Sequence, residues 1–437
     1  MAKKLTRAQR LAKRKYKPSN KFIYWLYKVI MVNIVGKKYK MKFNVIDQVP
    51  SDGPCFVVFN HLSRIDHVYV MGATYPRVTT MIAANNEFYR SKFSLVFALN
   101  NCIPKKCYTA DNLTIKGVSR VLKKGGCVTF APEGETSQYG ENKPVVPGTS
   151  KMFKHFKVPV YFCNIQGQHL LCNKVCTDVR LGETHATLSL LFSKDDIAAL
   201  SVEQMDDILN EKFRHDDYAW NAEKKIKWKT KGRTCVRLED FCYKCPKCGS
   251  EFTMKGVGDQ FTCSHCGNGT SMDDYFQFHP YPDSVIPASP VEWVKQERMD
   301  IIKQIRANAD YFFEDDCKIG NLDNYKLVGH NNTTFIVGEG KVRIDHQGLH
   351  YTGTRHGEPY QFSMDYKSLY TLMIAKDGNH FCLYNRGEYF EFFPSRQTVG
   401  KFCLLVEEMH RYHVNFYKNF KWYDYMYEGM ELGIDNQ

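Results

Sequence analysis

Two different hydrophobic patterns divide the chain, and together they exclude a single uniform fold. From residue 44 to about 240, short apolar runs alternate with helical stretches, which is typical of an α/β layer domain. From about residue 325 the runs become closely spaced strands separated by Gly, Asn and Asp turns. With 437 residues, 43% of them hydrophobic, the chain is long and apolar enough for two or three domains.

The elements expected in the first pattern are buried strands and the helices between or after them. The predicted strands are 56–59, 127–130 and 158–162, and the predicted helices are 114–124 and 201–213. Ser201 is expected to cap its helix, with Gln204 as the capping-box partner. This segment is therefore predicted to be a mixed sheet flanked by helices.

The elements expected in the second pattern are seven strands closed by one helix. The strands are predicted at 334–338, 341–345, 348–352, 360–363, 368–375, 380–385 and 388–393, and the helix at 395–412. Seven strands with a C-terminal helix resemble the pleckstrin-homology (PH) or GRAM superfold, a small β-barrel. That resemblance implies lipid or peptide binding, although a fold alone does not establish a function.

Four of the 16 cysteines form two closely spaced pairs. Cys245 and Cys248 make the first pair, and after 14 intervening residues Cys263 and Cys266 make the second. A glycine follows each pair, and the residues between the pairs suit a β-hairpin. Four thiolates in this spacing predict a closed, tetrahedral Zn²⁺ site rather than four free thiols. Its role would be structural, since some 25 residues bury too little core to fold alone.

The positive charge of the chain is concentrated at its N-terminus. The first 42 residues hold 14 Lys and Arg and no Asp or Glu, whereas the rest of the chain is nearly neutral. Residues 22–35 are apolar and aromatic, but they are interrupted by Lys28 and are too short for a membrane span. Basic flanks with aromatic residues favour a helix lying on an anionic lipid surface. A buried core helix with a solvated basic tail is the alternative.

A histidine and an aspartate directly follow the predicted strand 56–59, in the run Asn60-His61-Leu62-Ser63-Arg64-Ile65-Asp66. If Asp66 lies on the second turn of the next helix, its carboxylate can reach His61 and stabilise an imidazolium. The pair would then act as a general base. Because no Ser or Cys stands beside it, direct attack by a substrate hydroxyl is expected rather than a covalent enzyme intermediate. On its spacing alone the pair fits a structural histidine better.

A second polar loop follows the predicted strand 127–130, with the sequence Ala131-Pro132-Glu133-Gly134-Glu135-Thr136-Ser137. Gly134 permits a tight turn, and Glu133 stands where it can contact a polar substrate head. Taken in order with the first motif, this loop resembles part of the 1-acyl-sn-glycerol-3-phosphate acyltransferase family. That family carries four blocks in fixed order: N-H-x4-D, a segment ending in a basic residue, F-P-E-G-T-R-S, and an apolar V-P segment. Here the blocks are residues 60–66, 85–106, 131–137 and 158–160.

The resemblance implies a role for each matching residue. His61 would deprotonate the acceptor hydroxyl, Asp66 would orient His61, and the hydroxyl would attack the thioester of acyl-CoA or acyl-carrier protein. Glu133 and Gly134 would shape the acceptor pocket, and Lys105 or Lys106 would bind phosphate. The chain departs from the family at Glu135 and Thr136, which replace its Thr-Arg pair, so Thr136 stands where an Arg would grip a phosphate. Glu135 is expected to repel a phosphate.

We therefore expect a membrane-associated acyltransferase that acylates a lysophospholipid, with 1-acylglycerol-3-phosphate as the acceptor and phosphatidic acid as the product. Another lysolipid acceptor, such as a lyso-aminolipid or a glycolipid, stays open. The rival classes are a zinc-ribbon nucleic-acid-binding protein, which the few basic residues of the cysteine segment disfavour, and a lipid-binding scaffold. A peripheral place on the cytoplasmic face of a bacterial plasma membrane is expected, with structural Zn²⁺ as the resident metal.

The predicted domain boundaries follow these patterns. They are 1–42 for the basic arm, 43–240 for the acyltransferase domain, 241–272 for the zinc ribbon, 273–320 for a linker with a helix at 291–308, 321–420 for the PH/GRAM-like domain and 421–437 for an aromatic tail.

Overall fold

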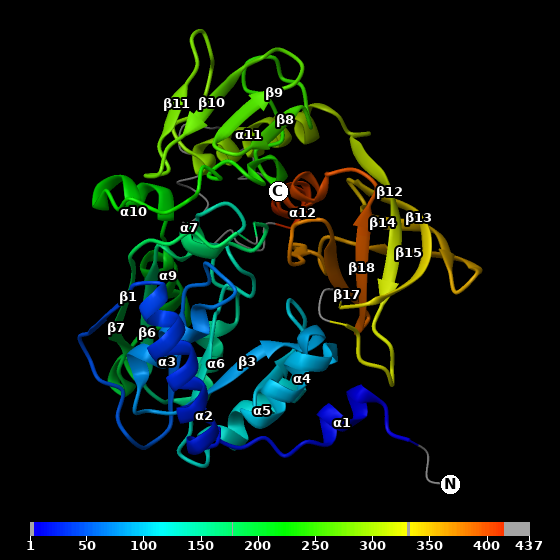
Figure 1. Ribbon diagram of the computed structural model, residues 1–437. Helices are drawn as coiled ribbons and strands as arrows, with labels where there is room; N and C mark the ends of the chain where they lie inside the picture. The colour runs from blue at the N-terminus through cyan, green and yellow to red at the C-terminus, as the bar shows by residue number, and fades with distance from the viewer. Residues whose placement is uncertain (1–3, 177, 330–332, 415–437) are drawn as a thin grey trace.

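The computed structural model of the protein describes residues 4–176, 178–329 and 333–414, so the predicted aromatic tail at 421–437 lies outside the described residues. The described residues form three sheets, which Figure 1 shows at the lower left, at the top and on the right. Helix α12 (Val399–His413) lies where the three parts meet. It contacts α11 (Pro290–Ala307) and two strands of the C-terminal sheet.

The first sheet is mixed, and this confirms the expected α/β layer domain. Its strand order is β1-β7-β6-β2-β5-β3-β4, and only the β6–β7 pairing is antiparallel. Buried apolar residues cover both faces of the sheet, as expected for a sheet between layers. The strands are β1 Met41–Val45, β2 Cys55–Phe59, β3 Thr79–Ala84, β4 Ile103–Lys105, β5 Cys127–Phe130, β6 Val160–Gln166 and β7 Thr184–Phe192.

Four helices of this domain, α5, α8, α9 and α10, begin at a residue whose side chain caps the helix. The side chain of Ser201 accepts a hydrogen bond from the backbone of Gln204, and the reciprocal bond completes the predicted capping box of α9. The helices are α3 Asp66–Thr74, α4 Ser91–Leu99, α5 Asn112–Leu122, α6 Thr149–Phe156, α7 Gln168–Cys172, α8 Lys194–Ala199, α9 Val202–Phe213 and α10 Asp217–Lys224, with short 3-10 turns at Asn85–Tyr89 and Leu238–Asp240.

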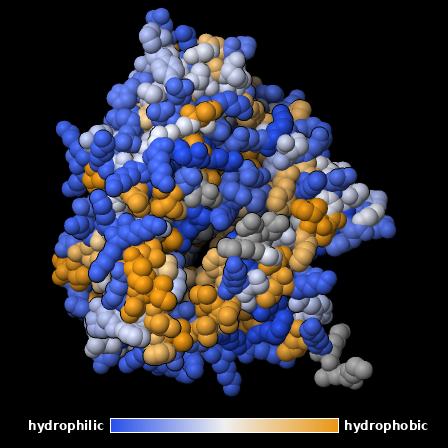
Figure 2. Space-filling model, viewed as in Figure 1, coloured by the Kyte–Doolittle hydropathy of each residue, from blue (hydrophilic) through white to orange (hydrophobic). Residues whose placement is uncertain are grey.

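The basic arm forms two short helices and a wider helical segment: α1 (Arg7–Lys13), α2 (Lys21–Lys28) and η1 (Val29–Gly36). Tyr24 and Tyr27 anchor α2 on the domain through hydrogen bonds to Thr79 and His67. The opposite face is apolar and exposed, which argues against the core-helix alternative. Its exposed residues are Phe22, Trp25, Leu26, Ile30 and Ile34. Figure 2 shows hydrophobic side chains gathered on this part of the surface. No helix among the described residues is long and apolar enough to cross a membrane.

The cysteine segment forms a four-stranded antiparallel sheet in the order β11-β10-β9-β8. Its strands are β8 Met254–Val257, β9 Gln260–Cys263, β10 Gly269–Met272 and β11 Phe278–Pro280. The expected hairpin between the two cysteine pairs is thus present as β8 and β9. Because β11 pairs with β10, the ribbon extends beyond the predicted boundary at residue 272.

The C-terminal sheet contains seven antiparallel strands in the order β15-β14-β13-β12-β18-β17-β16. Its strands are β12 Phe312–Asn321, β13 Phe335–Asp345, β14 Gly348–Arg355, β15 Glu358–Met364, β16 Met373–Ile374, β17 Phe381–Asn385 and β18 Glu388–Pro394. Strand number and the final helix agree with the expectation, whereas the resemblance to a PH or GRAM barrel stays a prediction.

Three details of the C-terminal prediction are wrong. Strand β12 lies in the segment predicted to be a linker, although it pairs with both β13 and β18 in the middle of the sheet. The strands predicted at 334–338 and 341–345 are one continuous strand, β13. Only Met373 and Ile374 of the strand predicted at 368–375 are paired. The predicted helix at 291–308 is confirmed as α11.

Candidate functional site

The two polar loops meet at one edge of the mixed sheet. Strands β2 and β5 are adjacent and parallel, so the loops that follow them leave the sheet side by side. The backbone N–H of Ser137 donates to the carbonyl of His61 at 2.7 Å, which joins the loops directly. Asn60 is buried and exchanges two hydrogen bonds with the backbone of Ile165 in β6, at 2.7 and 2.6 Å. His61 is thereby held against the central strands.

His61 and Asp66 are in direct contact. The Nδ1 atom of His61 lies 2.7 Å from Oδ2 of Asp66. The same carboxylate oxygen accepts the backbone N–H groups of Leu62 and Ser63, at 2.8 and 2.9 Å. Asp66 is the first residue of α3, so the expected position on the second turn is wrong; the side chain reaches His61 from the first turn. Burial raises the pKa of Asp66, and the hydrogen bond from His61 opposes that shift.

The second nitrogen of His61 contacts a hydroxyl of the other loop. Oγ1 of Thr136 lies 3.1 Å from Nε2 of His61. An ionised Asp66 can only accept, so the proton of a neutral ring belongs on Nδ1 and Nε2 is left as an acceptor. The Thr136 hydroxyl then donates to Nε2. The expectation was that no Ser or Cys stands beside the histidine; the hydroxyl that contacts its ring belongs to a threonine inside the second loop, which the sequence did not single out for this contact.

The carboxylate of Glu133 accepts hydrogen bonds from other residues of the protein. Its carboxylate accepts the backbone N–H groups of His61 and Lys143, at 2.7 and 3.0 Å, and the side-chain amide of Asn142 at 2.9 Å. Burial raises the pKa of Glu133 to about 8, and these donors oppose the shift. The glutamate therefore positions the His61 loop. Gly134 adopts a positive φ of 76°, and the Tyr108 ring lies 3.0 Å from where a Cβ atom would stand. Their predicted contact with an acceptor stays a prediction.

The two lysines predicted to bind phosphate both donate hydrogen bonds to backbone carbonyls. Lys105 donates to the carbonyls of Lys106 and Thr109 at 2.7 and 2.6 Å, and burial lowers its pKa. Lys106 donates to the carbonyl of Gly387, between β17 and β18, at 2.7 Å. None of these hydrogen bonds connects the amine of Lys105 or Lys106 to His61.

The negative charge of Glu135 is balanced by a neighbouring lysine. Glu135 forms a buried ion pair with Lys174 and accepts the backbone N–H of Ile374 in β16 at 3.0 Å. The expected repulsion between Glu135 and a phosphate is therefore countered by Lys174. The sequence near Glu135 gives no signal for its contact with Ile374, because the two residues are 239 positions apart.

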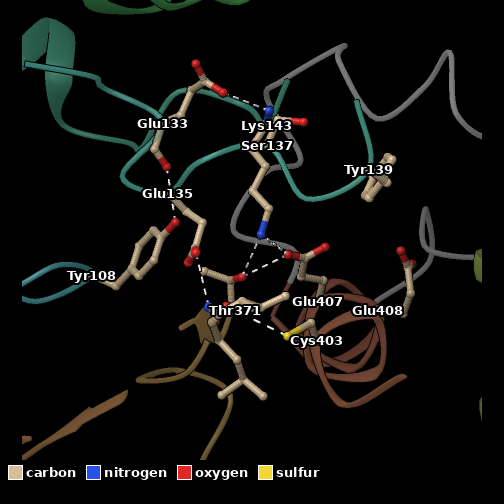
Figure 3. Close-up of polar contacts among 12 residues, drawn as sticks. Tyr108, Glu133, Glu135, Ser137, Tyr139, Lys143, Thr371, Cys403, Glu407 and Glu408 are labelled. Atoms are coloured by element: carbon tan, nitrogen blue, oxygen red, sulfur yellow. Dashed lines mark hydrogen bonds and ion pairs between the residues drawn. The ribbon is translucent and has the colours of Figure 1, made fainter. Parts of the chain in front are cut away.

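A buried polar network connects this site to the C-terminal helix (Figure 3). The amine of Lys143, whose backbone binds Glu133, lies 2.9 Å from Oε1 of Glu407 in α12. Glu407 also pairs with Arg298 of α11, and Thr371 donates to it at 2.8 Å. Burial alone would raise the pKa of Glu407, but the two cations lower it to about 2. The carboxylate is therefore firmly ionised, and the loop of Glu133 is braced against α11 and α12.

The four predicted ligand cysteines form one cluster. The Sγ atoms of Cys245, Cys248, Cys263 and Cys266 all lie within 4.8 Å of one another, with two separations of 3.7 and 3.9 Å. Zinc–sulfur bonds of about 2.3 Å in a tetrahedron require sulfur atoms about 3.8 Å apart, so the cluster has the dimensions of a four-thiolate zinc site. The side-chain amide of Asn268 donates to the Cys245 sulfur at 3.5 Å, and the Thr253 hydroxyl oxygen lies 3.3 Å from the Cys263 sulfur. Such donors are typical neighbours of a ligand shell.

Two comparisons with known proteins find a similarity to acyltransferases. Residues 40–166 match the family model described as Acyltransferase. Among solved structures, the chain is similar to the 1-acyl-sn-glycerophosphate (LPA) acyltransferase PlsC from Thermotoga maritima, with 14% identity over 44% of this chain and 91% of that chain, at a TM-score of 0.35. No curated protein matches the chain in sequence. The matched segment, residues 40–166, contains both polar loops.

Proposed function

We propose that this chain, whose residues 40–166 form an acyltransferase-family domain, transfers a fatty acyl group from an acyl thioester to a hydroxyl of a lysophospholipid. The donor is acyl-CoA or acyl-carrier protein. The observation that carries the proposal is the hydrogen-bonded pair of His61 and Asp66 at the carboxyl edge of the sheet. A base in this position accepts a proton through Nε2 while Asp66 stabilises the imidazolium that forms.

The acceptor has two candidates. The family resemblance favours 1-acylglycerol-3-phosphate, which would give phosphatidic acid. A lysolipid without a terminal phosphate is favoured by a specific observation, because Lys105 and Lys106 both donate to backbone carbonyls and Thr136 replaces the family's arginine. An anionic head group would have to draw one of these amines away from its carbonyl partners.

The acyltransferase would work at a lipid surface. Phe22 and Ile34 each expose 65% of their accessible area on the basic arm, and α4 adds the exposed side chains of Leu95 and Leu99. Figure 2 shows hydrophobic surface over both elements. Burying one such side chain in a bilayer contributes about 1.5–3 kcal/mol, and neighbouring lysines attract anionic head groups. Binding to duplex nucleic acid without affinity for anionic vesicles would contradict this and favour the nucleic-acid class.

The cysteine cluster would hold a structural Zn²⁺ through Cys245, Cys248, Cys263 and Cys266. All four ligand positions are filled by thiolates, so the ion would supply folding stability and leave no position for substrate. The ribbon packs on α11, where the indole of Trp293 donates to the carbonyl of Lys244 at 2.9 Å. Loss of the ion would therefore weaken the support of α11.

The proposed function is tested by incubating the protein with a labelled acyl thioester and a panel of lysolipids, and by identifying the product by mass. We expect one acylated lysolipid with the wild type and none with His61→Ala, since such a base contributes about 10²–10⁴-fold in rate. His185→Ala is the matched control, because His185 is a partly exposed histidine paired with Glu183. Retained turnover in His61→Ala, with unchanged folding and vesicle binding, would contradict the proposal.

A further inference from the structure

We propose that a small cavity behind the second polar loop binds a single monatomic anion of the size and charge of chloride, with Arg180 as its cationic ligand. The cavity has a volume of about 20 Å³, and Gln138, His169 and Arg180 lie on its wall. The cavity lies outside the pair of His61 and Asp66, so the inference goes beyond the proposed function and does not depend on it.

The cavity lies where the mixed-sheet domain meets the segments that flank the ribbon. Gln138 directly follows the second polar loop, His169 lies in α7, and Tyr218 lies in α10. Leu238 comes from the 3-10 turn before the ribbon, and Pro290 begins α11 after it. Figure 1 shows α7 and α10 between the mixed sheet and the ribbon. Segments that are far apart in the sequence therefore close around one space.

Arg180 brings a buried positive charge to this space. Only 3% of its accessible area is exposed, and its Nε has no hydrogen-bond partner among the described residues. The Phe276 ring lies 5.4 Å from Cζ of Arg180, but an aromatic ring covers one face of a guanidinium and leaves the in-plane N–H groups able to donate. Because a buried charge is costly without a partner, Arg180 calls for a bound negative group.

The acidic side chains near the cavity are bonded to other groups. Asp240 pairs at 2.7 Å with Arg237, which is the other arginine on the cavity wall. Asp217 lies 2.6 Å from His215 and accepts two backbone N–H groups, each at 2.7 Å. None of these bonds reaches Arg180. In the part of the chain that the structure describes, its guanidinium therefore keeps donors that no carboxylate accepts.

Two neutral polar side chains line the same cavity without partners. Gln138 is 2% exposed, and neither its amide nitrogen nor its carbonyl oxygen is hydrogen-bonded to a described residue. The Nδ1 atom of His169, a residue only 1% exposed, is not hydrogen-bonded either. Burial lowers the pKa of His169 to about 4, so the ring is neutral at pH 7 and can donate from Nδ1. Buried polar groups are seldom left unsatisfied, so their concentration around one space points to a ligand.

Size and charge together select the kind of ligand. The volume of about 20 Å³ exceeds the roughly 10–15 Å³ that one water molecule requires, but it is too small for a phosphate or a carboxylic acid. Water would satisfy Gln138 and His169 and leave the charge of Arg180 uncompensated. A monatomic anion accepts hydrogen bonds from the guanidinium, the amide and the imidazole N–H, and it carries the required charge.

The anion would join the second polar loop to the support of the ribbon. Gln138 directly follows Ser137, whose backbone N–H donates to the carbonyl of His61. Leu238 and Pro290, on the same cavity, belong to the segments before and after the ribbon. The ion is therefore a structural ligand, and its loss should lower the stability of the folded protein.

The test compares the thermal melting of the full-length protein in sodium chloride, sodium bromide and sodium gluconate at equal ionic strength. Gluconate is the control anion, because it is too bulky for the cavity. Replacing it by about 150 mM chloride or bromide should raise the melting temperature by at least about 2 °C, since an anion that binds only the folded state stabilises it by mass action. Arg180→Met should lose this response. Arg233→Gln should keep it, because Arg233 forms a surface ion pair with Asp178.

A second variant and a direct observation decide the matter if Arg180→Met does not fold. Gln138→Glu places a fixed carboxylate on the wall of the cavity, so it should melt at least as high as the wild type in gluconate and show no response to halide. In crystals grown with bromide, an anomalous scattering peak is expected in the cavity, within hydrogen-bonding reach of Arg180. Equal melting of the wild type in all three salts would overturn the inference. So would a halide response that persists in Gln138→Glu or in a folded Arg180→Met, or a cavity that holds only water in the bromide crystals.

Discussion

Replacing Glu407 by glutamine tests how strongly α12 is held to the loop that contains Glu133 and Lys143. The two cations beside Glu407 lower its pKa from an unfolded value of 4.5 to about 2. At 1.36 kcal/mol per unit, this difference stabilises the folded state by about 3 kcal/mol at neutral pH. Glu407→Gln also leaves Lys143 buried without its carboxylate, so we expect a loss of between about 3 and 5 kcal/mol.

The dependence on pH has a definite direction. A depressed carboxyl pKa stabilises the fold fully above pH 4.5, and the stabilisation is lost as pH falls from about 4.5 through about 2. The difference between wild type and Glu407→Gln in urea denaturation should therefore be largest near neutrality and shrink across that acidic range. Lys341→Gln is the control, since it breaks an exposed ion pair with Glu314 and should leave stability nearly unchanged at every pH. A pH-independent difference, or none, would refute the role assigned to Glu407.

The remaining predictions concern the site, the ribbon and the membrane face. Asp66→Asn should lower transfer by about 10²–10⁴-fold in a steady-state assay while melting changes little, since the amide cannot stabilise an imidazolium. Gly134→Ala should lower both melting temperature and activity, because a side chain there is strained by the positive φ and meets the Tyr108 ring. Chelation, or Cys248→Ser, should lower the melting temperature, and an unchanged value with the metal removed would argue against structural zinc. Phe22→Glu with Ile34→Glu should weaken flotation with anionic vesicles but spare transfer to detergent-dispersed acceptor.

Local sequence signals predicted the local parts of the structure. The capping box of Ser201, the buried strands of the mixed sheet and the cysteine hairpin each depend on residues a few positions apart. The contact of His61 with Asp66 was predictable for the same reason, although the helix begins one turn later than expected. Strand β12 was missed because its charged run, Glu314 to Asp316, hides the alternation of buried and exposed residues. Its position in the sheet is set by β13 and by the distant β18.

The rest of the site could not be predicted, because it is made of contacts between distant segments. Lys143 meets Glu407 across 264 positions, and Lys106 meets Gly387 across 281. From the sequence alone, a lysine at the end of the block 85–106 is equally consistent with a phosphate ligand and with a residue that hydrogen-bonds to another domain. Only the folded arrangement distinguishes the two, since it shows which carbonyl or carboxylate the amine has reached.

The two departures from the family motif have a common explanation in these contacts. The C-terminal sheet packs against the two polar loops of the mixed sheet, and Glu135 is one of the side chains that join them, through Lys174 and the backbone of Ile374. A residue used in this way is removed from substrate recognition, so its negative charge need not reach an acceptor. Thr136 follows in the same turn, where a long arginine is replaced by a short hydroxyl that reaches His61. At the position where the motif carries an arginine, this chain therefore carries a hydroxyl that contacts His61, and both departures lie in one turn of the loop. Substitutions at Thr136 should therefore alter acceptor selectivity and the hydrogen bond to His61 together.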